Sequence, residues 1–326
     1  MNVPRDGATA RGSGVAPALA EKGDPSLLDN RVGNAWLATC RLIGYGLLTV
    51  LLLLPQIAAL ICWPRFARCI PRTHHWLAAR VVGLCVRGEG EIATGKSIFF
   101  VSNHVSYFDI IALGSILQGN FVAKSDVATW PIFGPLARLC GTLFIERRST
   151  GAIKQVDIIR SRLERGDSLI VFPEGTSSDG SRVLPFKSTL FAAVEGKAII
   201  VQPISIHYSR LNGMPIGRAY RPFYAWYGDM DLAPHLWSAL SLGVAEVVIR
   251  FHAPVRASTF SDRKTLAKYC HAQISRGLGP DTPHEAPLDL ALPDDSLDHD
   301  KLRGNRRECL RLQLIARGTA PNDGFD

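Results

Sequence analysis

The sequence predicts an α/β fold: a mixed, largely parallel sheet flanked by helices, with an N-terminal membrane-anchoring helix or helical pair. Two observations predict this class. Short runs of β-branched and aromatic residues alternate with helical patterns between residues 97 and 255, which is typical of sheets whose strands are joined by crossover helices. An uncharged run at residues 42–63 precedes this region and is long enough for a membrane-embedded helix.

The expected strands are apolar runs at residues 97–104, 120–124, 141–147, 168–175, 198–208 and 246–255. Helical patterns lie between them at residues 107–117, 152–166 and 187–196. The pattern of 152–166 is the clearest, because four aliphatic residues recur at helical spacing before Gly166, a typical stop signal.

Four segments differ in composition. Residues 1–31 are rich in Gly, Ala and Pro and are expected to form a flexible leader. Residues 32–79 hold the apolar run and are expected to be the membrane anchor, and residues 80–280 hold the α/β domain. Residues 281–326 carry ten acidic and six basic residues without strand patterns, and are expected to be a poorly ordered acidic tail.

The positive charge is concentrated between the two ends of the chain. Residues 32–280 carry 27 basic and 15 acidic residues, whereas the whole chain has a formal net charge of +8. A body this basic suits an anionic membrane surface, an acidic carrier protein or a nucleic acid. The sequence has no zinc-finger spacing, no basic region before heptads and no aromatic RNA-binding signature, so a nucleic-acid partner is not expected.

Residues 42–63, bracketed by Arg41 and Arg65, determine how the chain meets a bilayer. At ~1.5 Å rise per residue this run spans a hydrocarbon core of ~30 Å. It either crosses the membrane or lies in one leaflet as a helical pair bent at Pro55. Arginines are more frequent after the run than before it, which predicts that the α/β domain lies on the cytoplasmic side of the membrane. In a bacterium this membrane would be the inner membrane.

The seven cysteines are scattered and include no Cys-x-x-Cys pair, which indicates a reducing compartment rather than a disulfide framework. Cys62 and Cys69 with His74 and His75 match no standard zinc spacing, so neither a metal nor a bound cofactor is expected. Cys140 lies nearest to a motif, and a buried structural thiol is preferred over a nucleophile there.

The most informative stretch is NHVSYFD (103–109), where an expected strand gives way to a helix. If His104 precedes the helix and Asp109 lies in its first turn, the carboxylate can accept a hydrogen bond from one imidazole nitrogen. That bond fixes the tautomer and leaves the other nitrogen to take a proton from an alcohol. Ser106 and Asp109 also fit a capping box, in which Asp109 only satisfies backbone donors.

Two further stretches place polar residues after expected strands. PEGTSSDG (173–180) follows an apolar strand, where sites of α/β folds commonly collect, although its composition also suits a simple turn. GTLFIERR (141–148) is an apolar strand that ends in a basic pair.

The sequence resembles the lysophospholipid acyltransferase family, which includes the 1-acylglycerol-3-phosphate and glycerol-3-phosphate acyltransferases. That family carries NHxSxxD, GxxFIxR, FPEGTRS and a VxPV-like strand in this order. This chain has NHVSYFD (103–109), GTLFIER (141–147), FPEGTSS (172–178) and VQPISI (201–206). The resemblance covers roughly residues 80–255, and it implies an O-acyltransferase with His104 as general base and Asp109 as its orienting partner.

The resemblance also implies contacts to the acceptor. Arg147, Glu174 and Gly175 are implied to help hold it, and Thr176 of the same motif is a further candidate for substrate binding.

The chain departs from the family at Ser177, where the family usually has an arginine positioned to bind the acceptor phosphate. Arg147 and Arg148, with Arg182 and Lys187, are candidates to supply that charge. A solvated basic face is the other interpretation of Arg182 and Lys187.

Together these expectations describe an enzyme that transfers a fatty acyl chain directly from its thioester with acyl carrier protein or coenzyme A to the hydroxyl of a membrane lysolipid. The preferred acceptor is 1-acylglycerol-3-phosphate, which would give phosphatidic acid. Lyso-ornithine lipid, an aminolipid without phosphate, is the alternative, because residues 177–191 look similar to the bacterial enzymes that acylate it. Thioester hydrolysis and a non-enzymatic lipid-binding role remain as further alternatives, and the His104–Asp109 pair disfavours the latter.

Overall fold

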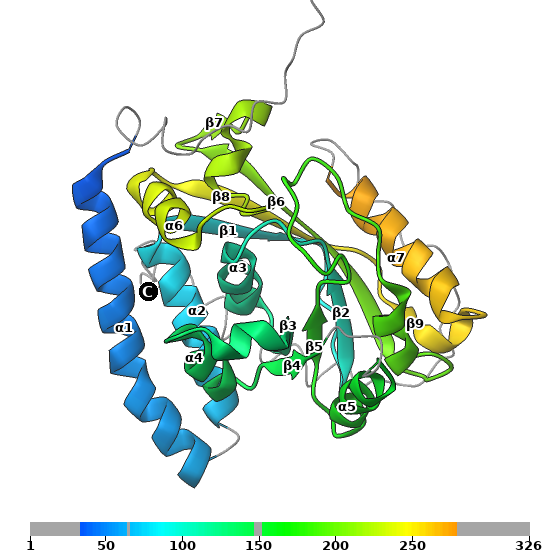
Figure 1. Ribbon diagram of the computed structural model, residues 1–326. Helices are drawn as coiled ribbons and strands as arrows, with labels where there is room; N and C mark the ends of the chain where they lie inside the picture. The colour runs from blue at the N-terminus through cyan, green and yellow to red at the C-terminus, as the bar shows by residue number, and fades with distance from the viewer. Residues whose placement is uncertain (1–32, 64–65, 147–151, 279–326) are drawn as a thin grey trace, which may run out of the picture. The chain divides into compact units, whose positions relative to one another are not determined.

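A computed structural model describes residues 33–63, 66–146 and 152–278 (Figure 1). The expected leader and the expected acidic tail lie outside the described residues, as does Arg147. The expected boundary between residues 79 and 80 lies inside a helix.

Nine strands of the described ranges form one sheet in the order β1-β8-β6-β2-β5-β3-β4, with β7 and β9 paired to β6. The strands are β1 (Leu84–Glu89), β2 (Ile98–Ser102), β3 (Asn120–Lys124), β4 (Leu143–Ile145), β5 (Leu169–Val171), β6 (Ile200–Leu211), β7 (Met214–Pro215), β8 (Ala245–Phe251) and β9 (Val255–Arg256). Pairing is parallel except where β6 meets β7, β8 and β9. The predicted mixed, largely parallel sheet is confirmed.

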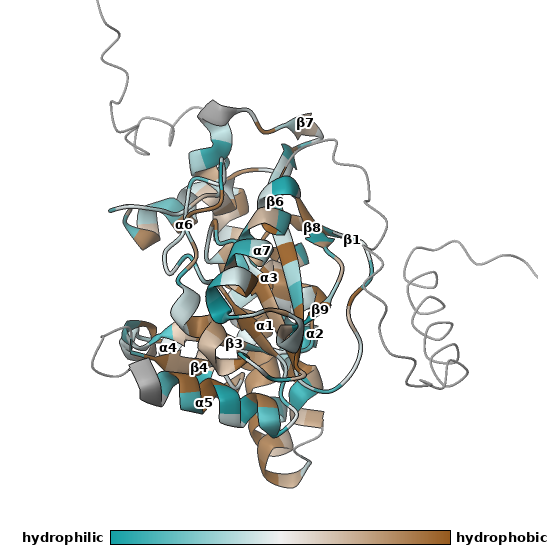
Figure 2. Ribbon diagram, turned by 90° about the vertical axis from the view of Figure 1, so that its right-hand side faces the viewer, coloured by the Kyte–Doolittle hydropathy of each residue, from teal (hydrophilic) through white to brown (hydrophobic). Residues whose placement is uncertain are grey.

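Helices cover both faces of the sheet (Figure 1). They are α1 (Ala35–Cys62), α2 (Cys69–Val81), α3 (Phe108–Ile116), α4 (Phe133–Leu139), α5 (Ala152–Glu164), α6 (Leu232–Ser241) and α7 (Arg263–Arg276). The 3-10 turns are η2 (Phe66–Arg68), η3 (Ser125–Thr129), η5 (Ser188–Ala193), η6 (Arg218–Phe223) and η7 (Ala257–Thr259). Helices α5 and α7 lie on one face, and Figure 2 shows hydrophilic colour on their outward sides above hydrophobic strands.

Strand β2 illustrates how the sequence builds two cores. Successive side chains of a strand point to opposite faces. Ile98 and Phe100 accordingly join the core beneath α2, α3 and α6, whereas Phe99 and Val101 join the core beneath α5 and α7. All four side chains are buried, which explains why the strand appears in the sequence as a continuous apolar run.

Several expected elements are shorter than their sequence patterns. The strand expected at 168–175 ends at Val171, two residues before Pro173, which has no N–H to donate to a ladder. The strand expected at 246–255 ends at Phe251, before Pro254, and resumes as β9. The helix expected at 187–196 is the six-residue 3-10 turn η5, which is too short to propagate as an α-helix.

Of the two alternatives for residues 42–63, the helical pair bent at Pro55 is not found, because α1 runs without interruption from Ala35 to Cys62. The chain turns only after Cys62, and α2 then packs against α1. Pro55 has no N–H to donate, so the carbonyl of Leu51 lacks its hydrogen bond within the helix. Both residues lie on the exposed side of the helix. This helix is the one element in the described residues long and apolar enough to cross a membrane.

Candidate active site

The strand-to-helix junction after β2 forms the centre of the candidate site. Asn103 holds it in place, because its side-chain amide donates to the carbonyl of Ile206 (2.9 Å) and accepts from the N–H of the same residue (2.9 Å). These two hydrogen bonds join one side chain to the neighbouring strand β6, and they fix the point at which the chain after Asn103 leaves the sheet.

His104 and Asp109 meet as the sequence predicts. His104 precedes α3 and Asp109 lies in its first turn, and His104 Nδ1 lies 2.8 Å from Asp109 Oδ2. The same oxygen accepts the backbone N–H groups of Val105 (2.7 Å) and Ser106 (2.9 Å), while Oδ1 accepts the Tyr208 hydroxyl (2.9 Å). The orienting and the capping interpretations are therefore both satisfied by one fully buried carboxylate.

The imidazole of His104 is held on two sides and accessible on a third. Its ring stacks on Phe172, the first residue of the FPEGTSS motif, with 4.2 Å between ring centres. The side chain retains 21% of its exposure, and Nε2 has no hydrogen-bond partner among the described residues. With Nδ1 turned to Asp109, Nε2 is the nitrogen that can meet a substrate hydroxyl.

Glu174 ties the two motifs together through the backbone. Its carboxylate accepts the N–H of His104 (2.9 Å) and the N–H of Leu184 (3.1 Å). Burial, together with the nearby charge of Asp109, raises the pKa of Glu174 to about 7. Both oxygens hold backbone groups, so the visible role of Glu174 is to position His104; its expected contact with the acceptor stays a prediction.

The adjoining residues of the motif shape the turn. Gly175 adopts φ +77°, a left-handed conformation that favours glycine. Thr176 is exposed, as are Arg182 and Lys187 further along the loop. Arg182 and Lys187 make no side-chain hydrogen bond or ion pair to another described residue, which leaves a solvated face and an acceptor contact both open.

Ser177, the residue that replaces the family's arginine, has a structural partner. Its hydroxyl donates to the carbonyl of Trp226, whose N–H in turn donates to the carbonyl of Val105 (3.0 Å). The neighbouring Ser178 N–H donates to the carbonyl of His104 (2.9 Å). Trp226 was not predicted as a site residue, because no motif surrounds it and only the fold brings it beside the histidine loop.

Asp179 adds a negative charge to the same loop. Burial alone would raise the pKa of this carboxyl, but hydrogen bonds from Ser181 and the charges of Arg221 and Arg182 hold it below its usual range. The loop beyond Ser177 therefore offers charges of both signs within reach of one another.

An apolar cavity of about 280 Å³ adjoins the histidine motif. Tyr107 and Phe108, which follow His104 in the chain, line this cavity together with residues of α1, α2, α3, α4, α6, β3 and η3. The Tyr107 hydroxyl is fixed by His235 Nδ1 at 2.9 Å. Cys140 also lines the cavity, and burial raises its pKa to about 11, which suits a structural thiol rather than a nucleophile.

Comparisons with known proteins agree with this geometry. A model of the Acyltransferase family matches residues 83–207. The chain is 42% identical to the lyso-ornithine lipid O-acyltransferase of Brucella abortus, over 62% of this chain and 78% of that protein. It is 40% identical to the lyso-ornithine lipid O-acyltransferase of Rhizobium meliloti, over 73% and 85%. It is also 31% identical to the 1-acyl-sn-glycerol-3-phosphate acyltransferase of Neisseria gonorrhoeae, over 58% and 72%.

The fold has a counterpart among solved structures. The crystal structure of the 1-acyl-sn-glycerophosphate acyltransferase of Thermotoga maritima superposes with a TM-score of 0.56 at 21% identity, covering 78% of this chain and 96% of that one. The sheet, the site and the family model together define an acyltransferase. More narrowly, the chain belongs to the lysolipid acyltransferase family that its four motifs predicted.

Proposed function

We propose that the protein transfers a fatty acyl chain from a thioester to the hydroxyl of lyso-ornithine lipid, with His104 as general base. The pairing of His104 Nδ1 with Asp109 Oδ2, which leaves Nε2 accessible, is the observation that carries the chemistry. The acceptor hydroxyl gives its proton to Nε2 as its oxygen attacks the thioester carbonyl. The carbon–sulfur bond then breaks, and the imidazolium returns the proton to the leaving thiolate.

Asp109 supports both halves of this reaction. A neutral imidazole whose Nδ1–H points at a carboxylate must present its lone pair on Nε2, which is the form that accepts a proton. When the imidazolium forms, the buried negative charge stabilises it. No covalent enzyme intermediate is required, so neither Cys140 nor Ser106 needs to act as a nucleophile.

The apolar cavity is the proposed place for the acyl chain of the donor. Tyr107 and Phe108, three and four residues after His104, line it, which supports an acyl chain there with its thioester carbonyl at the histidine motif. The donor is acyl carrier protein or acyl coenzyme A. Both are anionic and suit the basic body of the chain.

Two observations support lyso-ornithine lipid as the acceptor, and they reverse the order of preference expected from the sequence alone. The relatives with 40% and 42% identity are both lyso-ornithine lipid acyltransferases, whereas the phosphate-using relative is 31% identical. Ser177 is engaged with the Trp226 carbonyl where the family places a phosphate-binding arginine. An ornithine headgroup carries a carboxylate and an ammonium group, which Arg182 and Asp179 complement.

Membrane attachment is proposed to be lateral rather than spanning, on the cytoplasmic side. Helix α1 is held to the domain at three points along its length: Arg41 donates to the carbonyl of Leu240 (3.0 Å), Thr49 bonds His74 (3.0 Å), and Gln56 donates to the Leu139 carbonyl (2.9 Å). Arg41 thus caps the end of α6 instead of marking a membrane boundary.

The opposite side of α1 is apolar and exposed. It carries the large hydrophobic residues Trp36, Leu42, Ile43, Leu47, Val50, Leu51, Leu54, Ile57, Leu60 and Ile61. A helix bound along one side to the domain and apolar on the other fits a position in one leaflet, parallel to the surface.

The test is an acceptor panel with purified protein and a defined acyl donor, read by mass spectrometry of new diacyl lipids. We expect diacyl ornithine lipid to be the main product. Formation of phosphatidic acid alone would assign the second candidate, 1-acylglycerol-3-phosphate, and leave the chemistry intact. Steady thioester cleavage with no diacyl product would contradict the transferase mechanism.

A further inference from the structure

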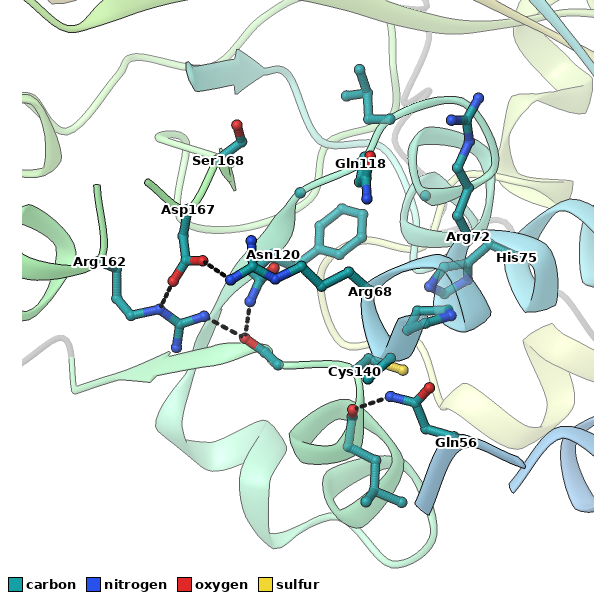
Figure 3. Close-up of a pocket in the computed structure, with 18 of the residues that line it drawn as sticks. Gln56, Arg68, Arg72, His75, Gln118, Asn120, Cys140, Arg162, Asp167 and Ser168 are labelled. Atoms are coloured by element: carbon teal, nitrogen blue, oxygen red, sulfur yellow. Dashed lines mark hydrogen bonds and ion pairs between the residues drawn. The ribbon is translucent and has the colours of Figure 1, made fainter. Parts of the chain in front are cut away.

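A polar pocket of about 430 Å³ adjoins the apolar cavity, and His104 does not line it (Figure 3). The pocket shares six lining residues with that cavity: Gln56, Pro71, His75, Phe121, Leu139 and Cys140. It is lined by Gln118 and Asn120 at the start of β3 and by Asp167 and Ser168 just before β5. Strands β2, β3 and β5 are parallel, and His104 follows the end of β2. The pocket therefore lies at the amino ends of these strands and His104 at the carboxyl end of β2; Gly114, near the end of α3, lines the pocket, whereas His104 precedes the start of α3.

The pocket is strongly basic. Arg68, Arg72 and Arg162 line it against a single carboxylate, Asp167, which pairs with Arg162 (2.6 Å) and Arg68 (3.4 Å). Arg72 has no hydrogen bond or ion pair to another described residue. His75 adds no charge, because burial and the neighbouring His74 lower its pKa to about 3. Two positive charges remain uncompensated, which suits a phosphate group that an arginine fork can bind.

The inner wall carries buried polar atoms without partners. Gln56 is only 6% exposed; its Nε2 donates to the Leu139 carbonyl, but its Oε1 has no partner among the described residues. Figure 3 shows this oxygen on the side of the Gln56 amide opposite to the dashed hydrogen bond of Nε2. His75 Nδ1 is likewise buried without a partner. An amide oxygen accepts only, so Gln56 calls for a ligand with an O–H or N–H donor.

The pocket borders the apolar side of α1. Leu60 lines the pocket and is 43% exposed, and Ile61, Trp63 and Phe66 beside it are all more than half exposed. Aromatic residues of this kind gather where a membrane meets water. A ligand in the pocket would thus have its charged part among the arginines and an apolar surface next to it.

From these observations we propose that the pocket binds the headgroup of an anionic phospholipid that also carries a hydroxyl donor. Its phosphate lies between Arg68 and Arg72, its hydroxyl donates to Gln56 Oε1, and its acyl chains lie along the exposed end of α1. Such a lipid would seat this end of the protein on the bilayer. The proposal rests on the proposed membrane attachment but not on the transfer chemistry at His104.

The test measures lipid retention on the full chain, purified in detergent, by native mass spectrometry without acyl donor. The protein is offered phosphatidylglycerol, phosphatidylcholine and phosphatidylmethanol, whose headgroup has no hydroxyl. Wild type should retain phosphatidylglycerol above both. The double variant Arg68→Gln/Arg72→Gln should retain at least about tenfold less phosphatidylglycerol than wild type, since the charge-assisted hydrogen bonds to the phosphate are removed. Arg80→Gln, an exposed arginine of the same helix that does not line the pocket, is the matched control.

The variant Gln56→Leu separates the contribution of the lipid's hydroxyl to binding from that of its phosphate charge. It should abolish the preference for phosphatidylglycerol over phosphatidylmethanol while both still exceed phosphatidylcholine. Equal retention by wild type and the double variant, or an equal loss in Arg80→Gln, would overturn the proposal. Displacement of phosphatidylglycerol by soluble glycerol phosphate would also overturn it, because the occupant would then be a soluble phosphate ester. Thermal unfolding of each variant, measured separately, reports whether the fold is intact; acyl transfer is not the control here, because Gln56 also lines the cavity proposed for the acyl chain.

Discussion

Replacing Asp109 by asparagine separates the catalytic role of this residue from its structural one. The carboxylate accepts three donors at Oδ2 and one at Oδ1. An asparagine oxygen can take the place of Oδ2, and its NH₂ group can donate to the Tyr208 hydroxyl, which is able to accept. The amide therefore fits, but the bonds to Val105 and Ser106 become neutral. Charge-assisted bonds are roughly twice as strong as neutral ones, so we expect a loss of about 2 kcal/mol in the free energy of unfolding.

Turnover should fall far more than this loss of stability implies. The imidazolium that forms on His104 would face a neutral oxygen, or the amide NH₂ would force the tautomer that carries its proton on Nε2. General-base catalysis contributes typically 10²–10⁴-fold, so the rate should drop by at least about 10²-fold. The assay compares initial rates with a fixed acyl donor and thermal unfolding of the same preparations. A folded Asp109→Asn protein that keeps more than about a third of its turnover would refute catalytic orientation and leave capping as the whole role.

Four further predictions follow from the site and from α1. His104→Ala should lower acyl transfer by at least about 10²-fold without releasing the protein from membranes, as judged by sedimentation and product analysis. The pKa of Glu174 is about 7 in the folded protein, against an ordinary value of 4.5. The free energy of unfolding of wild type should therefore fall as the pH rises from 4.5 to 7. Glu174→Gln should flatten that part of a plot of unfolding free energy against pH. Ser177→Arg should weaken acylation of lyso-ornithine lipid and raise use of lysophosphatidic acid in competition assays, because it removes the bond to Trp226 and adds a cation that attracts the phosphate but repels the ornithine ammonium group. Leu51→Ser with Leu54→Ser, on the exposed side of α1, should shift the protein toward the soluble fraction in high salt, whereas unchanged sedimentation would place the attachment elsewhere.

Local patterns were sufficient for much of the fold. The ends of strands β2 and β3 were predicted to within two residues, because short β-branched and aromatic runs are typical of buried strands. The pairing of His104 with Asp109 was predicted because it depends on one strand-to-helix turn, and the residues of that turn are adjacent in the chain.

Other features depend on contacts between distant segments. Helix α2 has histidines and arginines among its apolar residues, so its pattern is weak until α1 and α3 pack on it. Trp226 reaches the site only because its N–H meets the Val105 carbonyl. Arg41 resembled a membrane flank in the sequence, and its actual role requires the end of α6, about 200 residues away.

The role of Glu174 shows the same limit. Its place in the motif indicated function, but whether it touches substrate or backbone depends on where residues 104 and 184 run. In the structure both of its oxygens hold backbone N–H groups. Motifs thus identified which residues gather, while the fold determines which of them can face a ligand.

The central claim is that His104 drives acyl transfer to a lysolipid hydroxyl. Its most direct test is a single experiment in which wild type and His104→Ala receive the same acyl donor with lyso-ornithine lipid, and both diacyl lipid and free thiol are measured. We expect equal amounts of diacyl ornithine lipid and free thiol from wild type, and neither above background from the variant. Diacyl lipid formed by His104→Ala at a rate near that of wild type would contradict it.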